Sequence, residues 1–130
     1  LDTNKSLSQK NEMVLDSLIT YKIDYLFLVG CMFIIKGDLL KAYRKKIINI
    51  HPSLLPKFKG LNTFQRVLQN KEKKTGCTVH FVNKKLDSGK IILKKFFYIE
   101  SSDNKKTLKI KTQKLEYTSY SQAIIKIFCN

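Results

Sequence analysis

Hydrophobic and polar positions alternate between a helical and a strand-like period along the chain. In NEMVLDSLITY, Val14, Leu15 and Leu18 recur at helical spacing and predict an amphipathic helix over residues 11–21. The uninterrupted apolar run YLFLVG, residues 25–30, then predicts a strand that is buried on both faces, as strands of parallel sheets are. The chain therefore opens with a helix followed by a strand.

The same alternation continues to the end of the chain. Asp38 is expected to cap the second helix, and Asn62-x-x-Gln65 resembles the capping box that opens a third. The further predicted elements are helices at 38–45, 62–70 and 107–127 and strands at 46–51, 75–83 and 90–99. Strands separated by helices predict an α/β fold, with parallel crossovers first and an antiparallel pair of strands later.

Length and composition place the chain in a broad class. Its 130 residues suffice for one domain. The sequence holds no run of about 18 or more apolar residues to span a bilayer, and the polar start LDTNKSLSQK lacks the apolar region of a signal peptide. We therefore expect a soluble, cytoplasmic domain with no membrane contact. The three cysteines are too widely spaced to indicate a disulfide framework or a metal site.

The formal net charge of +15 raises the alternative of a basic nucleic-acid-binding module. Of the 25 basic residues only Arg44 and Arg66 are arginine, and the lysines are scattered along the whole chain. A phosphate-reading surface usually recruits the bidentate arginine fork as well as lysine. We therefore interpret the charge as a solvated surface, and we expect no specific nucleic-acid partner.

The segment IINIHPSLLPKFKG, residues 47–60, holds polar side chains within an apolar strand. Because strand residues alternate faces, Asn49 and His51 share one face, and Pro52 ends the strand directly after them. An amide can donate to an oxyanion, and an imidazole can move a proton near neutral pH. Asp87 offers a carboxylate that favours the imidazolium form. From spacing alone, backbone capping and ordinary turn chemistry explain these residues equally well, and His80 reads as a strand histidine.

A longer resemblance favours the chemical interpretation. The stretch NIHPSLLPKFKG, followed by TGCTVHFVNKKLDSGKIIL, resembles the folate-dependent formyltransferases, above all those that formylate glycinamide ribonucleotide in purine biosynthesis. The likeness runs from about Tyr25 to the Gln113-x-x-Glu116 helix. It implies a Rossmann-like, mostly parallel sheet with helices on both faces. It also implies transfer of a formyl group from 10-formyltetrahydrofolate to the amine of glycinamide ribonucleotide, without a metal.

The resemblance also implies roles for individual residues. Asn49 is expected to bind the formyl oxygen, His51 to assist the oxyanion and deliver a proton, and Asp87 to orient His51 and help move protons through water. The residues expected to contact the ribonucleotide are Met32, Ile50, Pro52, Gln113 and Glu116. The residues expected to form the pteridine pocket are Ile34, Ile35, Leu40, Ile47, Val82 and Leu86. The Leu55-Pro56 bond resembles the family's cis-proline turn.

Several features depart from the family pattern. Phe33 stands where the family commonly has arginine, and Phe64 replaces a usual histidine. The first βα units of the family, with their glycine-containing phosphate loop, have no counterpart in residues 1–24. We therefore expect residues 1–130 to be the C-terminal portion of a formyltransferase domain, and to transfer formyl groups poorly or not at all alone. The alternatives within the family are 10-formyltetrahydrofolate deformylase and methionyl-tRNA formyltransferase.

Overall fold

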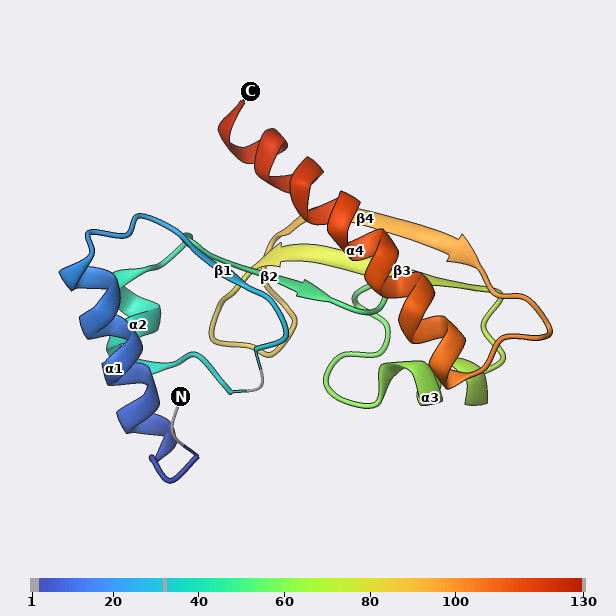
Figure 1. Ribbon diagram of the computed structural model, residues 1–130, viewed down its shortest axis with the longest axis horizontal. Coiled ribbons are helices and arrows are strands. Elements are labelled where there is room, and N and C mark those ends of the chain that lie inside the picture. The colour runs from blue at the N-terminus through green and yellow to red at the C-terminus, as the bar shows by residue number, and fades with distance from the viewer. Residues whose placement is uncertain (1–2, 32, 130) are drawn as a thin grey trace.

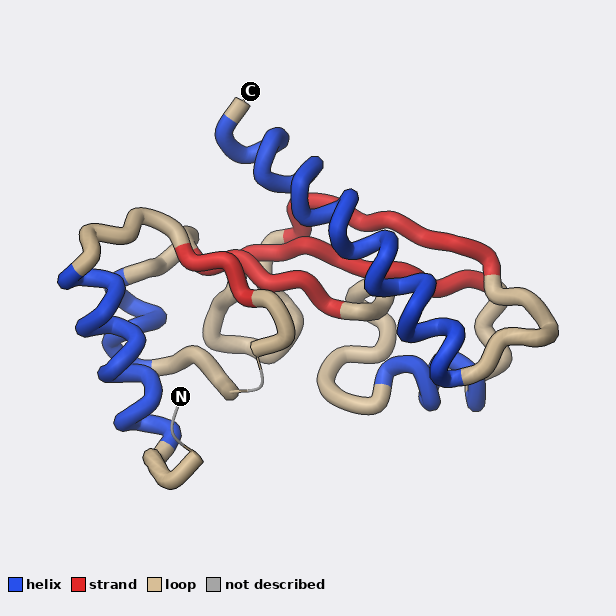
Figure 2. The backbone as a smooth tube through the Cα atoms, viewed as in Figure 1, coloured by secondary structure: helices blue, strands red, loops and turns tan. Residues whose placement is uncertain are grey.

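A sheet with helices on both faces organises the protein (Figures 1 and 2). The computed structural model describes residues 3–31 and 33–129, and within them the sheet has four strands. The strands are β1 (Leu26–Leu28), β2 (Ile47–His51), β3 (Lys74–Phe81) and β4 (Ile91–Tyr98). The helices are α1 (Leu7–Thr20), α2 (Gly37–Ala42), α3 (Thr63–Gln69) and α4 (Lys105–Phe128). This order confirms the expected α/β class.

The sheet is mixed, with the spatial strand order β1-β2-β3-β4. β1 and β2 are parallel and are connected through α2, whereas β2 with β3 and β3 with β4 pair antiparallel. The parallel part is therefore smaller, among the described strands, than the mostly parallel sheet that we expected. The cause is the connection after β2: the chain passes through α3 and re-enters the sheet at the end where β2 stopped, so β3 must run back along it.

Alternate side chains of β2 face the two helical layers. Ile48 and Ile50 pack in a buried cluster with residues of β3, β4 and α4. Ile47 packs on the other face, in a cluster with residues of α1 and α2. Because side chains alternate along a strand, Asn49 and His51 share the face of Ile47. This face therefore carries both polar candidate residues of β2.

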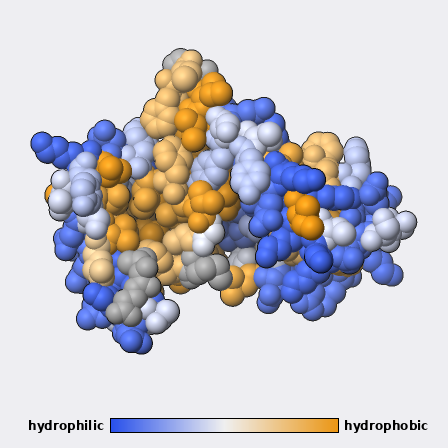
Figure 3. Space-filling model, viewed as in Figure 1, coloured by the Kyte–Doolittle hydropathy of each residue, from blue (hydrophilic) through white to orange (hydrophobic). Residues whose placement is uncertain are grey.

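An apolar group of side chains covers the α4 side of β1, which is one edge of the described sheet. Tyr25 and Phe27 meet Phe128 edge to face, with ring centroids 4.7 and 6.5 Å apart. The Tyr120 hydroxyl lies 2.7 and 3.0 Å from carbonyl oxygens of β1 and β2. Figure 3 shows this apolar surface over β1 and the C-terminal turns of α4. The last helix is thereby tied to the edge of the sheet.

The helix ends differ from the expectation where capping is concerned. α1 begins before the expected residue 11 because Ser6 and Gln9 form a capping box. Asp38 lies inside the first turn of α2 and does not cap it. Asn62 precedes α3 with a left-handed φ of 55° and makes no side-chain cap hydrogen bond, so the expected box with Gln65 is wrong. A residue in the left-handed region lacks the extended backbone that a capping side chain needs.

α4 extends along the sheet and matches the expected final helix. It opens with a capping box between Asn104 and Thr107. Its buried positions are Leu108, Thr112, Ser119 and Ala123. In the part of the chain that the structure describes, neither α4 nor any other helix combines the length and apolar content needed to cross a membrane.

Candidate active site

The carboxyl end of β2 places the two polar residues of the sequence motif next to β3. Asn49 is opposite His80 and His51 is opposite Thr78 in the antiparallel ladder. Asn49 is half-buried and His51 is buried. The loop between β3 and β4 brings Asp87 to this site from a distant part of the sequence, and the ion pair of Asp87 with His51 confirms that they meet.

Both ring nitrogens of His51 face oxygen acceptors. Nδ1 lies 3.4 Å from Oδ2 of Asp87, and Nε2 lies 2.8 Å from the carbonyl oxygen of Phe58. A carbonyl oxygen only accepts, so Nε2 carries a hydrogen. The Asp87 carboxyl group lies beside the other ring nitrogen. Only 7% of the side chains of His51 and Asp87 is exposed, so little water competes for them.

Asp87 is fixed by backbone geometry as well as by His51. Its φ is 47°, a left-handed conformation that Asp and Asn tolerate better than most residues. The amide of Gly60 donates to the Asp87 Oδ2 atom over 2.8 Å. Two separate loops, 57–60 and 82–90, thus meet at this carboxylate.

His80 is a second histidine beside Asp87, and its position in the predicted strand favoured a strand histidine over a chemical role. Its Nδ1 lies 2.9 Å from the Phe81 carbonyl oxygen and therefore carries the ring hydrogen. Its buried Nε2 has no hydrogen-bond partner among the described residues and lies 3.8 Å from Oδ1 of Asp87. Burial lowers the pKa of His80 from 6.5, although the Phe81 carbonyl and Asp87 oppose this change. The neutral ring therefore presents a lone pair toward the carboxylate.

The protonation of His80 predicts a pH dependence of stability. The folded-state pKa is below the unfolded value, so the unfolded chain takes the proton first as the pH falls below about 6.5. Folding stability is then lost by at most about 1.4 kcal/mol per pH unit for this one group. His80→Gln is expected to lose less stability than the original chain between about pH 7.5 and about pH 5.5, as measured by urea unfolding.

A control variant separates this titration from a general loss of packing. Ile92→Val removes one methylene from the buried core and is expected to cost about 1 kcal/mol at both pH values. An acid-induced loss in His80→Gln as large as in the original chain would show that another group causes it.

A hydrogen-bonded turn supports the end of β2. The Thr78 hydroxyl donates to the Ser53 carbonyl oxygen over 2.7 Å and accepts from the Leu55 amide over 3.0 Å. Lys94 Nζ donates to the Leu55 carbonyl oxygen over 2.8 Å. The Leu55-Pro56 peptide bond is cis, which confirms the turn that the resemblance implied. These contacts tie the proline turn to β3 and β4, next to the site.

Four of the residues expected in the pteridine pocket lie in one apolar cluster, and two do not. The clustered residues are Ile35, Leu40, Ile47 and Val82, packed with residues of α1 and α2. Ile34 and Leu86 are instead 61% and 63% exposed. Exposed apolar side chains leave surface that a flat heterocycle can cover.

The residues expected to contact the ribonucleotide are spread over both faces of the sheet. Met32 lies outside the described residues. Ile50 belongs to the buried cluster beneath α4, so its backbone rather than its side chain remains for a ligand. Gln113 is exposed and Glu116 is half-buried on α4, one turn before the tyrosine that bonds β1 and β2. Burial raises the pKa of Glu116 from 4.5.

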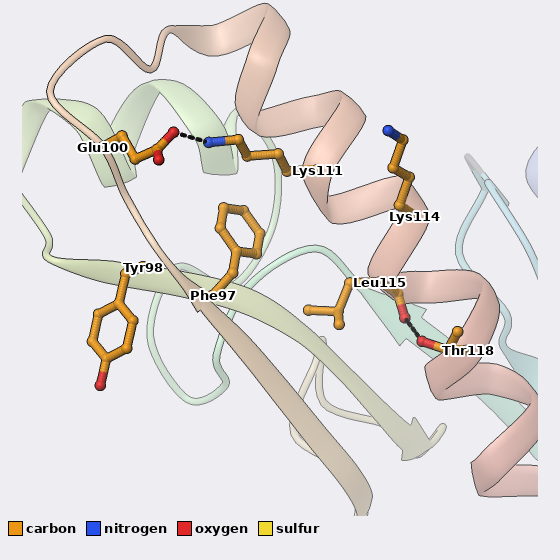
Figure 4. Close-up of a pocket in the computed structure, with 7 residues that line it drawn as sticks. All are labelled: Phe97, Tyr98, Glu100, Lys111, Lys114, Leu115 and Thr118. Atoms are coloured by element: carbon orange, nitrogen blue, oxygen red, sulfur yellow. Dashed lines mark hydrogen bonds and ion pairs between the residues drawn. The ribbon is translucent and has the colours of Figure 1, made fainter.

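A shallow groove between α4 and the end of β4 is not part of this constellation. It has a volume of about 410 Å³, and Figure 4 shows Phe97 pointing toward α4 and Tyr98 pointing away from it. Lys111 is paired with Glu100 at 2.8 Å and with Asp103 at 2.9 Å. These contacts fasten the β4–α4 connection.

The sequence did not indicate three of the contacts that define the site. The Phe58 carbonyl and the Gly60 amide are backbone groups, and no residue pattern reveals where a loop will point them. His80 lies two residues after Thr78 on β3, so both side chains face the side of the sheet that carries Asn49 and His51. This spacing identifies His80 as a site residue only once the register of β3 against β2 is known.

The sequence matches a known protein family. The chain matches the family model described as "Formyl transferase" over residues 2–124. Phosphoribosylglycinamide formyltransferase of Haemophilus influenzae is 37% identical over 123 residues, which cover 92% of this chain and 58% of that protein. The trifunctional purine biosynthetic protein adenosine-3 of Homo sapiens is 37% identical over 120 residues, which cover 88% of this chain and 12% of that protein.

Solved structures show the same fold. Glycinamide ribonucleotide transformylase 1 from Symbiobacterium toebii matches with a TM-score of 0.91 and 34% identity, over 95% of this chain and 59% of that one. A formyltetrahydrofolate deformylase from Pseudomonas syringae matches with a TM-score of 0.83 and 25% identity, over 87% of this chain and 38% of that one. The chain thus spans less than two thirds of the length of each of these relatives.

Proposed function

The chain belongs to the formyl transferase family, and from that premise we propose that it carries the chemistry of formyl transfer from 10-formyltetrahydrofolate to the amine of glycinamide ribonucleotide. The observation that carries the proposal is the buried contact between His51 and Asp87 beside Asn49, at the carboxyl end of β2. An acyl transfer needs an oxyanion donor and a proton carrier around one carbonyl group.

The proposed chemistry gives each of these three side chains a role. As the amine nitrogen bonds to the formyl carbon, the Asn49 amide donates to the oxygen on which negative charge develops. The His51 Nε2 hydrogen, which faces the Phe58 carbonyl oxygen in the structure, turns to the same oxygen. When the bond from carbon to the folate nitrogen breaks, that nitrogen keeps the electron pair and takes a proton from His51. Asp87 accepts the proton lost by the attacking amine, directly or through water.

The folate is proposed to bind on the α1 and α2 side of the sheet. The exposed side chains of Ile34 and Leu86 supply apolar surface there, and the 82–87 segment supplies backbone groups. Ile35 and Ile47 are buried beneath that surface and support it. An apolar slot with few polar groups suits a flat heterocycle.

The ribonucleotide is proposed to lie across the carboxyl ends of β1 and β2. From there it meets Asn49 on one face of the sheet, and Gln113 and Glu116 on the α4 face. The backbone at Ile50 and Pro52 lies between these groups. Both substrates are small molecules, and the proposal includes no specific nucleic acid and a cytoplasmic location.

Glu116→Gln is expected to make the protein more stable at neutral pH and less able to bind the ribonucleotide. A raised folded-state pKa means that the stabilising protonated form is fully present below about pH 4.5 and is lost as the pH rises through the folded pKa. At about pH 7 the ionised carboxylate is therefore a cost that glutamine removes. The KM for the ribonucleotide is expected to rise about tenfold, because a charged hydrogen-bond acceptor is lost.

Urea unfolding and steady-state kinetics measure the two effects of Glu116→Gln separately. Glu12→Gln, on the exposed surface of α1, is the matched control and should change neither quantity. A lower urea midpoint together with an unchanged KM would contradict this role of Glu116.

The proposed function is tested by one spectrophotometric assay of 10-formyltetrahydrofolate with and without glycinamide ribonucleotide. Two forms are compared: the 130-residue chain, and a chimera that joins it to the part of the Haemophilus influenzae relative that the match leaves uncovered. Folate product that depends on the ribonucleotide, in at least one form, is the expected result. Consumption without the amine acceptor would indicate a deformylase, and no consumption in either form would contradict formyl transfer.

A further inference from the structure

The loop of residues 57–60 contacts both members of the His51–Asp87 pair. The Phe58 carbonyl oxygen lies 2.8 Å from Nε2 of His51, and the Gly60 amide donates to Oδ2 of Asp87 over 2.8 Å. The first contact fixes the rotation of the imidazole ring, and the second fixes the carboxylate oxygen that faces Nδ1. The geometry of the pair therefore depends on where this loop lies.

The loop adopts a backbone conformation that needs outside support. Phe58 has a φ of 56°, in the left-handed region that side chains other than those of Asn and Asp rarely occupy. Gly60 has a φ of 80°, which glycine adopts freely. Strain of this kind persists only where surrounding contacts determine the conformation. At Phe58 those contacts must come from neighbouring elements.

Arg66, in α3, supplies two such contacts. Its guanidinium Nη2 donates to the Lys59 carbonyl oxygen. Its Cζ atom lies 5.7 Å from the centroid of the Phe58 ring, within the range of a cation–π contact. Among the described residues, Arg66 has no acidic partner, so its charge is directed at the loop. The Arg66 side chain thus contacts both the Lys59 backbone and the ring of Phe58, whose carbonyl oxygen faces His51.

A lysine cannot reproduce this arrangement. The guanidinium is planar, can stack on a ring and can donate in a fixed direction at the same time, whereas an ammonium is a compact point charge. A second tether, from Lys59 Nζ to the Ser88 hydroxyl at 2.7 Å, links the loop to the segment that carries Asp87. Arg66 therefore acts on one end of a short chain of contacts that reaches both His51 and Asp87.

We propose that Arg66 is a positioning residue of the formyl-transfer site: it holds the 57–60 loop so that, until the substrates bind, the Phe58 carbonyl keeps His51 aligned with Asp87 and Asn49. The inference rests on the proposed function, because alignment matters only if His51 does chemistry. Arg66 touches neither the reacting atoms nor His51 itself. Its effect passes through the loop backbone.

The test compares Arg66→Ala and Arg66→Lys with Lys57→Ala as the matched control. Lys57 lies in the same loop and pairs with Glu72 at 3.1 Å, so its loss also removes one positive charge, but the Lys57 side chain holds no contact to His51. The first measurement is nitrogen-15 and proton NMR of the His51 ring in the substrate-free protein. In both Arg66 variants the Nε2 hydrogen is expected to exchange with water at least about tenfold faster, as expected for loss of a buried hydrogen bond. Lys57→Ala should leave it unchanged.

The second measurement is turnover, which separates this inference from the proposed function. Both Arg66 variants are expected to lower kcat by about tenfold to a hundredfold, because misplacement of a catalytic group is costly. KM should stay unchanged, and added methylguanidinium should restore part of kcat in Arg66→Ala. Formyl transfer can fail in both the original chain and the chimera while the Arg66 variants still speed exchange of the His51 Nε2 hydrogen. In that case the proposed function is wrong, but the positioning of His51 by Arg66 through the 57–60 loop is supported.

Two outcomes would overturn the inference. One is a His51 ring signal in Arg66→Lys that matches the original chain. The other is a loss of kcat in the Arg66 variants no larger than in Lys57→Ala. The lysine variant keeps the charge and the helix propensity of α3, so it remains informative if the alanine variant does not fold.

Discussion

His51→Ala is expected to lower the kcat of formyl transfer by about a thousandfold or more, in the more active of the 130-residue chain and the chimera. The substitution removes the imidazole ring that lies between Asp87 and the Phe58 carbonyl oxygen. Both proton delivery and part of the oxyanion stabilisation are then lost together. Steady-state turnover with saturating substrates measures the effect, and the KM values should change little.

The control for His51→Ala must show that the loss is chemical. The buried ring fills space, so the variant is expected to lose some stability, and turnover is compared well below its unfolding temperature. His51→Asn keeps a polar side chain but no titrating group, and it should be as inactive as the alanine variant. Turnover retained in His51→Asn would show that proton transfer by His51 is not required.

Asp87→Asn is expected to lower kcat by about a hundredfold to a thousandfold while leaving the fold in place. Asparagine tolerates the left-handed backbone at this position, and its amide oxygen can still accept from the Gly60 amide. What disappears is the carboxylate beside Nδ1 of His51, which in the proposed chemistry orients the ring and accepts the proton of the attacking amine. Steady-state turnover with saturating substrates measures the loss of kcat.

A matched carboxylate tests whether position or charge alone matters for Asp87. Asp38→Asn removes an exposed partner of Lys41, far along the sequence from the site, and should leave kcat unchanged. An Asp87→Asn variant with the original kcat would show that Asp87 takes no part in the chemistry.

Local patterns in the sequence predicted where the helices and strands lie better than they predicted the direction in which each strand runs. The alternation in β2 predicted correctly that Ile48 and Ile50 point to one face of the sheet and Asn49 and His51 to the other, because a strand has a period of two. The direction of β3 could not be read in the same way, because it depends on where the chain re-enters the sheet after α3. The capping box predicted at Asn62 failed because the sequence pattern did not show the left-handed backbone that Asn62 adopts before α3.

The side-chain contacts of the candidate site could be predicted from the sequence, but its backbone contacts could not. The motif with Asn49 and His51, together with the distant Asp87, predicted a meeting that the structure confirms for His51 and Asp87. The Phe58 carbonyl and Gly60 amide contribute as much to the geometry, but every residue has such groups. The catalytic roles of the three side chains stay predictions.

The central claim is that this chain carries formyl-transfer chemistry on Asn49, His51 and Asp87. The most direct measurement is a single-turnover experiment with 10-formyltetrahydrofolate labelled in the formyl carbon, excess protein and glycinamide ribonucleotide, read by mass spectrometry. The account predicts that label appears in the ribonucleotide with the original residues, in the chain or in the chimera, and that His51→Ala and Asp87→Asn abolish it on the same timescale. No labelled ribonucleotide with the original residues, or equal labelling by the two variants, would contradict the account.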